Sequence, residues 1–450
     1  MHGGDIYRNQ VQYDFSVNLN PRGIPEGVLG ALEEAIHHVT EYPDLHHQEL
    51  RTMLAERWNV SEQQIVLGNG ASEIISAFVQ AYQPKSCLLT APAYTGYERA
   101  IRGICPDCIC HYYTLRPEQN FILQEDIADE IRRVKPDMLI LTNPNNPNGK
   151  LIPPEVLDAI LTAAGETDTA VMIDECFMAL TGQEETHSLL WKFKYSLSHL
   201  STMPITSPVT PPVTTPLTTP LQNHDDTSGN IASPDVPGMS ETSGKSEAPG
   251  TSEALGTPEA LPEILRETSP AITPETMPET MPEALPDGSM PNTLVLRSFT
   301  KTFAIPGVRL GYAVALAGTT QESIANATRV SGSLPEWNLS VFAQKAGAAC
   351  LVEAAYVADS LPLIVEEREY LTRGLTKLGY KVFPSDVNYI LFRSTDTHLP
   401  VKLLSEGILI RSCEDYRGLG TGYYRIAVLN HAKNEILLEA MQRMADIDHH

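Results

Sequence analysis

The sequence has little positive charge. Of its 450 residues, 32 are Lys or Arg and 56 are Asp or Glu, which gives a formal net charge of −24 at pH 7. Surfaces that bind nucleic acid or anionic membranes need clustered positive charge, so we expect neither as a partner. An anionic substrate would need a local group of basic side chains in this acidic protein.

Long apolar runs are also missing. No stretch reaches the roughly 20 apolar residues that a transmembrane helix needs. The N-terminal residues MHGGDIYRNQ lack the apolar core of a signal peptide. We therefore expect a cytoplasmic protein, and a chain of this length can form two or more domains.

Cysteine is scarce, with seven residues scattered along the chain. An odd, scattered set in a large chain is not typical of a disulfide framework, so reduced thiols are expected. Cys105, Cys108 and Cys110 lie close together in CPDCIC, a pattern that a metal knuckle can use. No second Cys or His pair stands at zinc-like spacing, and we expect no metal site.

The most informative segment present is SFTKTFAIPGVRLG, residues 298–311. It follows the apolar run TLVLR, typical of a buried strand, so Ser298, Thr300 and Lys301 are predicted at a strand's C-terminal end, where α/β sheets bind ligands. A Pro-Gly turn then brings Arg309 back. A lysine in such a pocket can form a Schiff base with an aldehyde cofactor, and hydroxyls with a guanidinium suit its phosphate. Taken alone, the pattern is equally typical of a solvated lysine; with the segments below it predicts a pyridoxal phosphate site.

This segment resembles the lysine segment of the aspartate-aminotransferase superfamily, the fold type I pyridoxal-phosphate enzymes. Within it, the branch of histidinol-phosphate aminotransferases and threonine-phosphate decarboxylases is most similar. The resemblance covers the chain except for about residues 196–292. It implies an α/β fold with a mostly parallel seven-stranded large domain, a small α/β C-terminal domain, pyridoxal 5'-phosphate as cofactor and a homodimer.

A second segment, IVLGNGASEIISAFVQAY, predicts a short strand, a Gly-Asn-Gly turn and an amphipathic helix that starts near Ala71. The free amides and the dipole at a helix N-terminus favour an anion. Gly70, Ala71 and Ser72 are therefore candidates to hold the cofactor phosphate, together with Ser298 and Arg309. A lone Gly-x-Gly is most often a plain turn between a strand and a helix.

The resemblance assigns the groups around the cofactor ring. Tyr94 is expected to stack on the pyridine, and Asn146 in NPNNPNG to contact the phenolic oxygen and the substrate. Asp174 ends the apolar run TAVMID and is expected to keep the ring nitrogen protonated. Lys301, Asp174 and Tyr94 are thus the expected catalytic residues. Phe177 stands where aminotransferases usually carry a tyrosine, which agrees with the decarboxylase branch.

Substrate contacts are implied near both ends of the chain. The HGG start and the segment DFSVNLNP resemble those of threonine-phosphate decarboxylases, and they assign His2, Gly3 and Asn20 to the substrate. Arg425 matches the arginine that receives the substrate carboxylate, and Arg411 one that receives its phosphate. A guanidinium fork fits both anions, although exposed arginines at a strand edge are the ordinary alternative.

Tyr42 lies in a Tyr-Pro-Asp turn before a helical pattern. By resemblance, this tyrosine crosses a dimer interface to the cofactor phosphate of the neighbouring subunit. A Tyr-Pro pair on its own usually marks a turn with a packed ring.

Residues 196–292 differ sharply in composition from the rest of the chain. They hold 17 of the 34 prolines, with 13 acidic and 2 basic residues and near-repeats such as TPETMPETMPEALP. This composition predicts a disordered insertion. The expected order is an N-terminal arm at 1–40, the first part of the large domain at 41–195, the insertion at 196–292, the lysine segment of the large domain at 293–330 and the small domain at 331–450.

The resemblance implies a carboxy-lyase that converts L-threonine O-3-phosphate to (R)-1-aminopropan-2-ol phosphate for the cobalamin side chain. The alternative is a histidinol-phosphate aminotransferase, which shares the cofactor site but removes the Cα proton. A catalytically inactive interaction protein conflicts with the complete set of Lys301, Asp174, Asn146 and Arg309. Phosphothreonine and phosphoserine differ by one methyl group, worth about 1 to 3 kcal/mol of discrimination, so both stay open as substrates beside histidinol phosphate.

Overall fold

The computed structural model describes residues 4–202 and 290–448. Most of the predicted insertion, together with His2 and Gly3, lies outside the described residues. Helix α8 (Leu189–Thr202) continues past residue 196, where the insertion was expected to begin. The difference has a simple cause, since the first proline of this region is Pro204 and nothing before it interrupts a helix.

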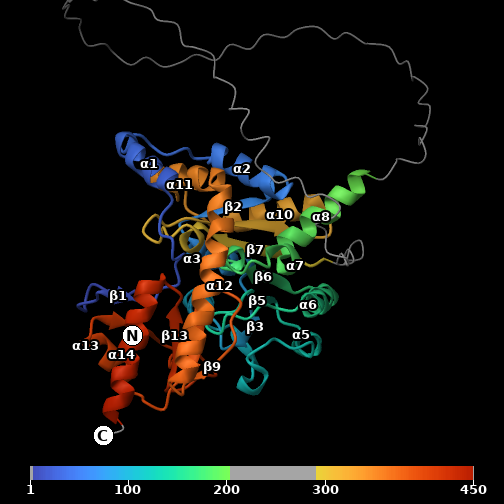
Figure 1. Cartoon of the computed structure of the whole chain (residues 1–450). Coiled ribbons are helices and arrows are strands. Elements are labelled where there is room, and N and C mark those ends of the chain that lie inside the picture. Colours follow the sequence, from blue (N-terminus) through green and yellow to red (C-terminus); the bar gives the residue numbers. More distant parts are fainter. Residues whose placement is uncertain (1–3, 203–289, 449–450) are drawn as a thin grey trace, which may run out of the picture. The chain divides into compact units, whose positions relative to one another are not determined.

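Seven strands form one sheet in the order β2-β8-β7-β6-β5-β3-β4 (Figure 1). Their bounds are β2 (Ile65–Gly68), β3 (Ser86–Ala91), β4 (Ile109–Thr114), β5 (Met138–Thr142), β6 (Ala170–Asp174), β7 (Thr293–Ser298) and β8 (Gly311–Leu316). Strand β8 is antiparallel to both of its neighbours, and every other pair is parallel. The predicted fold class, with a mostly parallel seven-stranded sheet, is confirmed.

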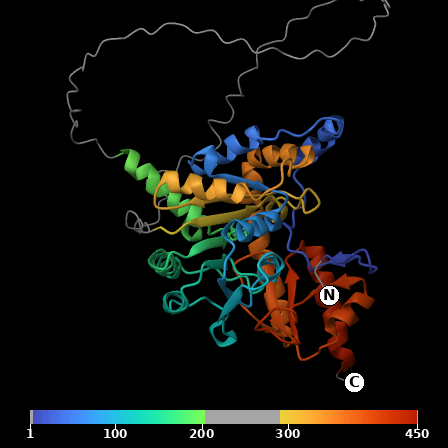
Figure 2. The ribbon, with the colours of Figure 1, turned by 180° about the vertical axis from the view of Figure 1, so that it is seen from behind.

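Helices cover both faces of this sheet, as Figures 1 and 2 show from opposite sides. One face packs on α2 (Gln48–Trp58), α5 (Ile127–Val134) and α6 (Pro154–Glu166). The other face packs on α3 (Ala71–Tyr82), α4 (Gly96–Ile104) and α10 (Thr320–Ser331). Strands buried on both faces read as continuous apolar runs, which explains the pattern seen in the sequence.

Strand alternation decides where the polar residues at the strand ends point. On β6, Val171 and Ile173 belong to the α5/α6 face, whereas Met172 belongs to the α3/α4 face. Successive side chains point to opposite faces. Asp174 is therefore directed to the α3/α4 face and Glu175 to the opposite one.

A second, antiparallel sheet has the order β12-β13-β10-β9. Its strands are β9 (Lys381–Val382), β10 (Tyr389–Arg393), β12 (Arg411–Ser412) and β13 (Tyr423–Ala427), and a separate parallel pair joins β1 (Tyr13–Asp14) to β11 (Ile408–Leu409). The long helix α12 (Ala354–Lys377) contacts this sheet, α14 (His431–Asp448) and the short helix η4 (Met178–Leu180). The remaining helices are α1 (Glu26–Ala35), η1 (Ile36–His38), η2 (Glu62–Gln64), η3 (Pro117–Gln119), α7 (Glu184–His187), α9 (Phe299–Thr302), α11 (Val341–Val352) and α13 (Leu399–Ser405).

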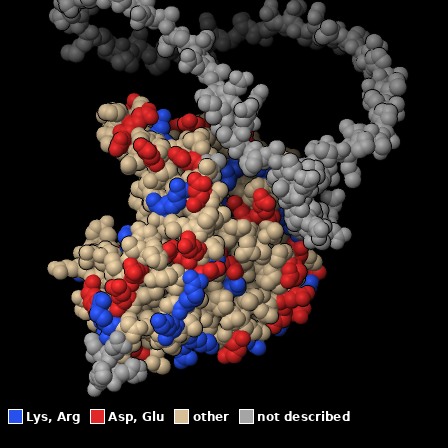
Figure 3. All heavy atoms as spheres, viewed as in Figure 1, with Lys and Arg blue, Asp and Glu red and all other residues tan. Residues whose placement is uncertain are grey.

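The described surface mixes both signs of charge. On the face drawn in Figure 3, acidic side chains form several separate groups with basic side chains between them. Among the described residues no single helix is long and apolar enough to cross a membrane, although α11 and residues 355–377 pass that test together as a bent pair.

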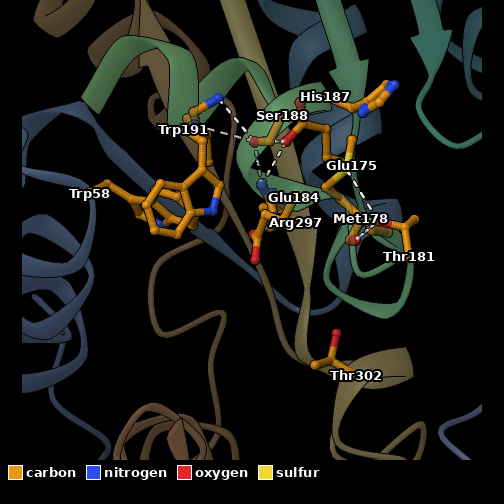
Figure 4. Close-up of polar contacts among 12 residues, drawn as sticks. Trp58, Glu175, Met178, Thr181, Glu184, His187, Ser188, Trp191, Arg297 and Thr302 are labelled. Carbon is orange, nitrogen blue, oxygen red and sulfur yellow. Dashed lines mark hydrogen bonds and ion pairs between the residues drawn. The ribbon is translucent and has the colours of Figure 1, made fainter. Parts of the chain in front are cut away.

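A buried ion cluster joins the C-terminal ends of β6 and β7 (Figure 4). The Arg297 guanidinium lies 2.7 Å from a Glu175 carboxylate oxygen and 2.5 Å from one of Glu184. It also donates to Ser188 Oγ at 2.7 Å, and its cation lies over the Trp58 ring. Arg297 and Glu175 are 4% and 1% exposed, so neither charge has water as an alternative partner.

We predict that Arg297→Met strongly destabilises the protein, because Glu175 and Glu184 would lose their buried counter-charge. Breaking a buried pair in this way typically lowers the free energy of unfolding by about 3 to 5 kcal/mol. Urea unfolding of both proteins measures the difference. Arg373→Met is the control, since Arg373 and its partner Glu369 are exposed, and it should change little. A loss below about 1 kcal/mol for Arg297→Met would contradict the expectation.

Candidate active site

A cavity of about 670 Å³ lies at the C-terminal ends of the parallel strands, bounded on one side by β12 and β13. Most of the predicted site residues line it: Ala71, Ser72, Tyr94, Asn146, Asp174, Ser298, Thr300, Lys301, Arg309, Arg411 and Arg425. These residues come from strands and turns far apart in the sequence. The sheet topology thus brings the predicted lysine, carboxylate, amide and arginines to one place.

Lys301 lies on the short helix α9, directly after β7. Ser298 begins this helix, and its Oγ accepts a hydrogen bond from the Thr300 amide at 3.1 Å. Burial, with the positive charges of Arg425 and Arg309, lowers the pKa of Lys301 to about 8. An amine in this range is partly neutral near physiological pH, which a nucleophile needs.

At the anion-binding end of the cavity, the backbone at Gly70 and Gly311 lies very close to Arg309 and to the start of α3. Gly70 has φ +79°, and a Cβ there would lie 2.4 Å from an Arg309 guanidinium nitrogen. A Cβ on Gly311 would lie 2.6 Å from the Ala71 amide nitrogen at the start of α3. Both glycines are therefore needed for Arg309 to reach the helix N-terminus. Free amides, the helix dipole and a guanidinium together suit a phosphate.

Asp174 stands at the other end, buried and hydrogen bonded. Tyr97 donates its hydroxyl to Oδ2 at 2.7 Å, and the Cys176 amide donates to Oδ1 at 2.9 Å. Burial raises the pKa of the Asp174 carboxyl, and the donors Cys176 and Tyr97 act in the opposite direction. Tyr94 lines the cavity nearby, with its ring edge-on to Tyr97 at 5.4 Å.

These residues fit pyridoxal 5'-phosphate. The amides and Arg309 suit its phosphate, Lys301 its aldehyde and Asp174 its ring nitrogen. The close approach of Gly70 and Gly311 leaves the space that such a cradle requires.

Arg425 and Arg411 form the wall that faces the lysine. Arg425 donates to Asn146 Oδ1 at 2.6 Å and to the Ser16 carbonyl at 2.8 Å. Arg411 donates to both carboxylate oxygens of Asp415, at 2.9 and 2.8 Å. Both arginines are buried, unlike the exposed strand-edge arginines that the sequence left open.

Asn20, predicted to contact the substrate, is not among the residues that line the cavity, and its side chain is hydrogen bonded elsewhere. Its amide nitrogen donates to the Thr302 carbonyl at 3.0 Å and to Ser360 Oγ at 2.9 Å. Its backbone amide donates to the Lys301 carbonyl at 3.0 Å. Asn20 therefore stabilises the turn that carries Lys301 from the side away from the cavity. Ser16 and Asn18 of the same segment line the cavity.

Three other predicted residues need separate mention. Gly70 supports the cradle without lining the cavity. Tyr42 is 84% exposed, lies outside the cavity and packs on Trp337 with ring centroids 5.3 Å apart. Phe177 lines the cavity and meets the Tyr389 ring edge-on at 5.1 Å, an apolar contact where a hydroxyl was expected in aminotransferases.

Several cavity residues were missed by sequence reasoning. Tyr97, Asp415 and Tyr416 line the cavity, and each stands close to a predicted residue, Tyr94 or Arg411, without having been assigned a role itself. Asn18 lies within the quoted DFSVNLNP segment, and its buried Oδ1 has no hydrogen-bond partner in the described part of the chain. That segment was thus a usable signal, although it did not show which side chain points inward.

Comparison with known sequences gives a consistent result. The family model described as Aminotransferase class I and II matches residues 10–198 and 276–441. The threonine-phosphate decarboxylase of Salmonella typhimurium is 25% identical over 436 residues, covering 96% of this chain and 90% of that protein. The histidinol-phosphate aminotransferase of Methanosphaera stadtmanae is 22% identical over 438 residues, covering 95% and 89%.

Solved structures share the fold. That of L-threonine-O-3-phosphate decarboxylase from Porphyromonas gingivalis has a TM-score of 0.63 and 20% identity, covering 96% of this chain and 99% of that one. Histidinol-phosphate aminotransferase from Sinorhizobium meliloti, in complex with pyridoxal-5'-phosphate, has a TM-score of 0.64 and 16% identity, covering 96% and 92%.

We predict that Lys301 titrates near pH 8 rather than at the ordinary lysine value of about 10.5. Covalent capture of pyridoxal by the cofactor-free protein, followed by borohydride reduction, should therefore rise through pH 8. Arg425→Gln should move the midpoint upward, because a nearby positive charge disfavours the ammonium form.

Arg411→Gln is the control for that shift, since Arg425 and Arg309, rather than Arg411, are the main positive charges that lower the pKa of Lys301. A midpoint near 10.5 in the unaltered protein, or an equal shift in both variants, would contradict the prediction.

Proposed function

Because the chain belongs to the aminotransferase class I and II family, we propose that it is a pyridoxal-phosphate-dependent carboxy-lyase. Its substrate is L-threonine O-3-phosphate, and its products are (R)-1-aminopropan-2-ol phosphate and carbon dioxide. The phosphorylated amino alcohol would be used to build the side chain of cobalamin. The Salmonella relative carries the name of this activity and is similar over nearly its whole length.

The arrangement of two arginines is the observation that carries this proposal. Arg411 and Arg425 are direct cross-strand partners in β12 and β13, and both line the cavity that holds Lys301. Like charges directly opposite on a sheet destabilise it unless anions neutralise them. A substrate with a carboxylate at one end and a phosphate at the other supplies two such anions.

Asp415 shows that the Arg411 guanidinium accepts an anion. In the structure its carboxylate contacts Arg411 through both oxygens, while its side chain remains 42% exposed. A substrate phosphate would replace this carboxylate on Arg411. The Arg425 guanidinium, held by Asn146 and the Ser16 carbonyl, is left for the substrate carboxylate.

When bound, pyridoxal phosphate withdraws electrons from the substrate Cα through its protonated ring. Asp174 would hold the proton on the ring nitrogen, and Tyr94 would cover the ring face. The bond from Cα to the carboxylate breaks, its electron pair stays at Cα, and carbon dioxide leaves. The Lys301 ammonium then gives Cα its proton. A pKa of about 8 allows this amine both to hold and to release a proton near neutral pH.

Transamination of histidinol phosphate is the second candidate. It is favoured by the Methanosphaera relative, which is similar over almost the same share of this chain. Phe177 weighs against it, because the side chain in the cavity has no hydroxyl to bind the phenolic oxygen. The two reactions differ in a measurable way, since only transamination needs an amino-group acceptor.

We predict that the purified protein releases carbon dioxide from O-phosphothreonine without any keto acid. Arg411→Ala should lower kcat/KM for this substrate by about 30-fold to several thousand-fold, the usual effect of removing a buried charge partner. It should change turnover of unphosphorylated threonine far less, whereas Arg425→Ala should impair both substrates.

Arg393→Ala, an exposed arginine on β10 of the same sheet, serves as the control and should leave both rates unchanged. Thermal unfolding and cofactor content are compared in all variants. Equal losses on threonine and phosphothreonine in Arg411→Ala would refute the phosphate assignment. Product formation that depends on a keto acid, without carbon dioxide, would favour the aminotransferase.

We further propose a cytoplasmic homodimer in which Tyr42 completes the phosphate site of the partner subunit. Its ring is 84% exposed in one chain, and Ile36 and Val39, six and three residues earlier in the sequence, are 57% and 58% exposed. Single exposed apolar residues are ordinary, but neighbouring ones favour an interface.

Subunit complementation tests this arrangement. Tyr42→Ala and Lys301→Ala should each be nearly inactive, and unfolding and refolding them together should restore activity. A random mixture gives mixed dimers with one intact site, so the recovery should approach about a quarter of the normal rate. No recovery, with mixed dimers present, would show that Tyr42 serves its own subunit.

A further inference from the structure

We infer that Tyr97 is a positioning residue that acts through Asp174. It holds the carboxylate ionised and aimed at the cofactor's ring nitrogen. This inference rests on the proposed use of pyridoxal phosphate, and no sequence motif pointed to it.

Asp174 depends on few donors. It is 7% exposed, and its described hydrogen bonds come from the Tyr97 hydroxyl and the Cys176 amide. Among the described residues no salt bridge to Asp174 is found within 4.0 Å, although the Lys301 ammonium, at longer range, lowers the pKa of the carboxyl. A buried carboxylate without a close cation stays ionised only through the hydrogen bonds that it accepts. Tyr97 makes the short, direct side-chain hydrogen bond among them, and the Cys176 side chain also lowers the pKa of the carboxyl.

The polarity of the hydrogen bonds follows from the chemistry of the three groups. Tyr97 is 1% exposed, and its hydroxyl oxygen also lies 2.9 Å from Thr142 Oγ1. An ionised carboxylate only accepts, so Tyr97 must donate to Asp174. Its single proton is then used, and Thr142 must donate to Tyr97. The relay from Thr142 through Tyr97 fixes both the charge and the orientation of Asp174.

Tyr97 also links the carboxylate to the ring expected to stack on the cofactor. The Tyr94 and Tyr97 rings meet edge-on, 5.4 Å apart at 88°. Tyr97 lies in the first turn of α4, and its amide donates to the Tyr94 carbonyl at 3.4 Å. One side chain therefore contacts the group at the ring nitrogen and the group at the ring face.

A plain packing role is the competing explanation, because Tyr97 belongs to the apolar cluster on the α3/α4 face. Tyr97→Phe separates the two. It keeps the ring, its packing and its contact with Tyr94, and it removes only the hydroxyl that reaches Asp174. Thr142→Val is a second variant, which leaves Tyr97 in place and removes its donor.

The test compares two ligands of the cofactor-free protein, pyridoxal 5'-phosphate and its 1-deaza analogue, in which carbon replaces the ring nitrogen. Dissociation constants are measured by absorbance and fluorescence titration. Losing a hydrogen bond to a charged group should weaken pyridoxal phosphate binding roughly tenfold to a hundredfold in Tyr97→Phe. The analogue, which offers Asp174 no proton, should bind within about twofold of normal. Thr142→Val should shift the same ratio in the same direction by less.

Two control variants complete the design. Asp174→Asn should abolish the preference for pyridoxal phosphate, and adding Tyr97→Phe to it should have no further effect on the ratio. Tyr82→Phe removes another tyrosine hydroxyl, one that donates to Asn326 on α10, and should leave both constants unchanged.

The outcomes separate this inference from the proposed function. Equal weakening of both ligands in Tyr97→Phe, or no weakening of either, would overturn the positioning role while leaving the enzyme's reaction in place. Failure of the unaltered protein to bind pyridoxal phosphate would overturn the proposed function and this role with it.

Discussion

The site depends on strand alternation at the ends of β6 and β7. At each end, one residue points to the cavity and the next to the opposite face, so Asp174 and Ser298 face the cavity while Glu175 and Arg297 lie behind it. The ion pair behind the sheet ties the two strand ends together at 2.7 Å. The rigidity of this ion pair fixes the separation of Asp174 and Ser298, which face the cavity. Buried ion pairs of this kind add little net stability by themselves. We therefore attribute this pair to the positioning of the two strand ends rather than to stability.

The cavity differs in charge from the chain that contains it. Five basic side chains line it, Arg99, Lys301, Arg309, Arg411 and Arg425, in a protein whose formal net charge is −24. Acidic surfaces repel polyanions, whereas a pocket of concentrated positive charge attracts a small anion. This difference in charge favours the binding of a small anion in the cavity and disfavours nucleic acids.

Much of the site could be predicted from the sequence because its residues stand in short local motifs at strand ends. Lys301, Asp174 and Asn146 stand at or just after apolar runs that form strands, Arg309 stands just before strand β8, and formation of the sheet brings all four together. Tyr97 and Asp415 were not predictable, since their roles arise from contacts with distant elements. Asn20 shows the limit most clearly. The motif identified the segment but not which of its side chains line the cavity, and those are Ser16 and Asn18.

The contact between Arg425 and the Ser16 carbonyl joins residues 409 positions apart. During synthesis the N-terminal segment leaves the ribosome long before its partners β11 and β13 exist, and chains grow at roughly 5 to 20 residues per second. For on the order of half a minute or more, the N-terminal segment therefore lacks the strands with which it forms hydrogen bonds. The lysine and its phosphate cradle can assemble earlier than the arginine wall. Order of synthesis thus places the arginine wall of the cavity last among these parts to leave the ribosome.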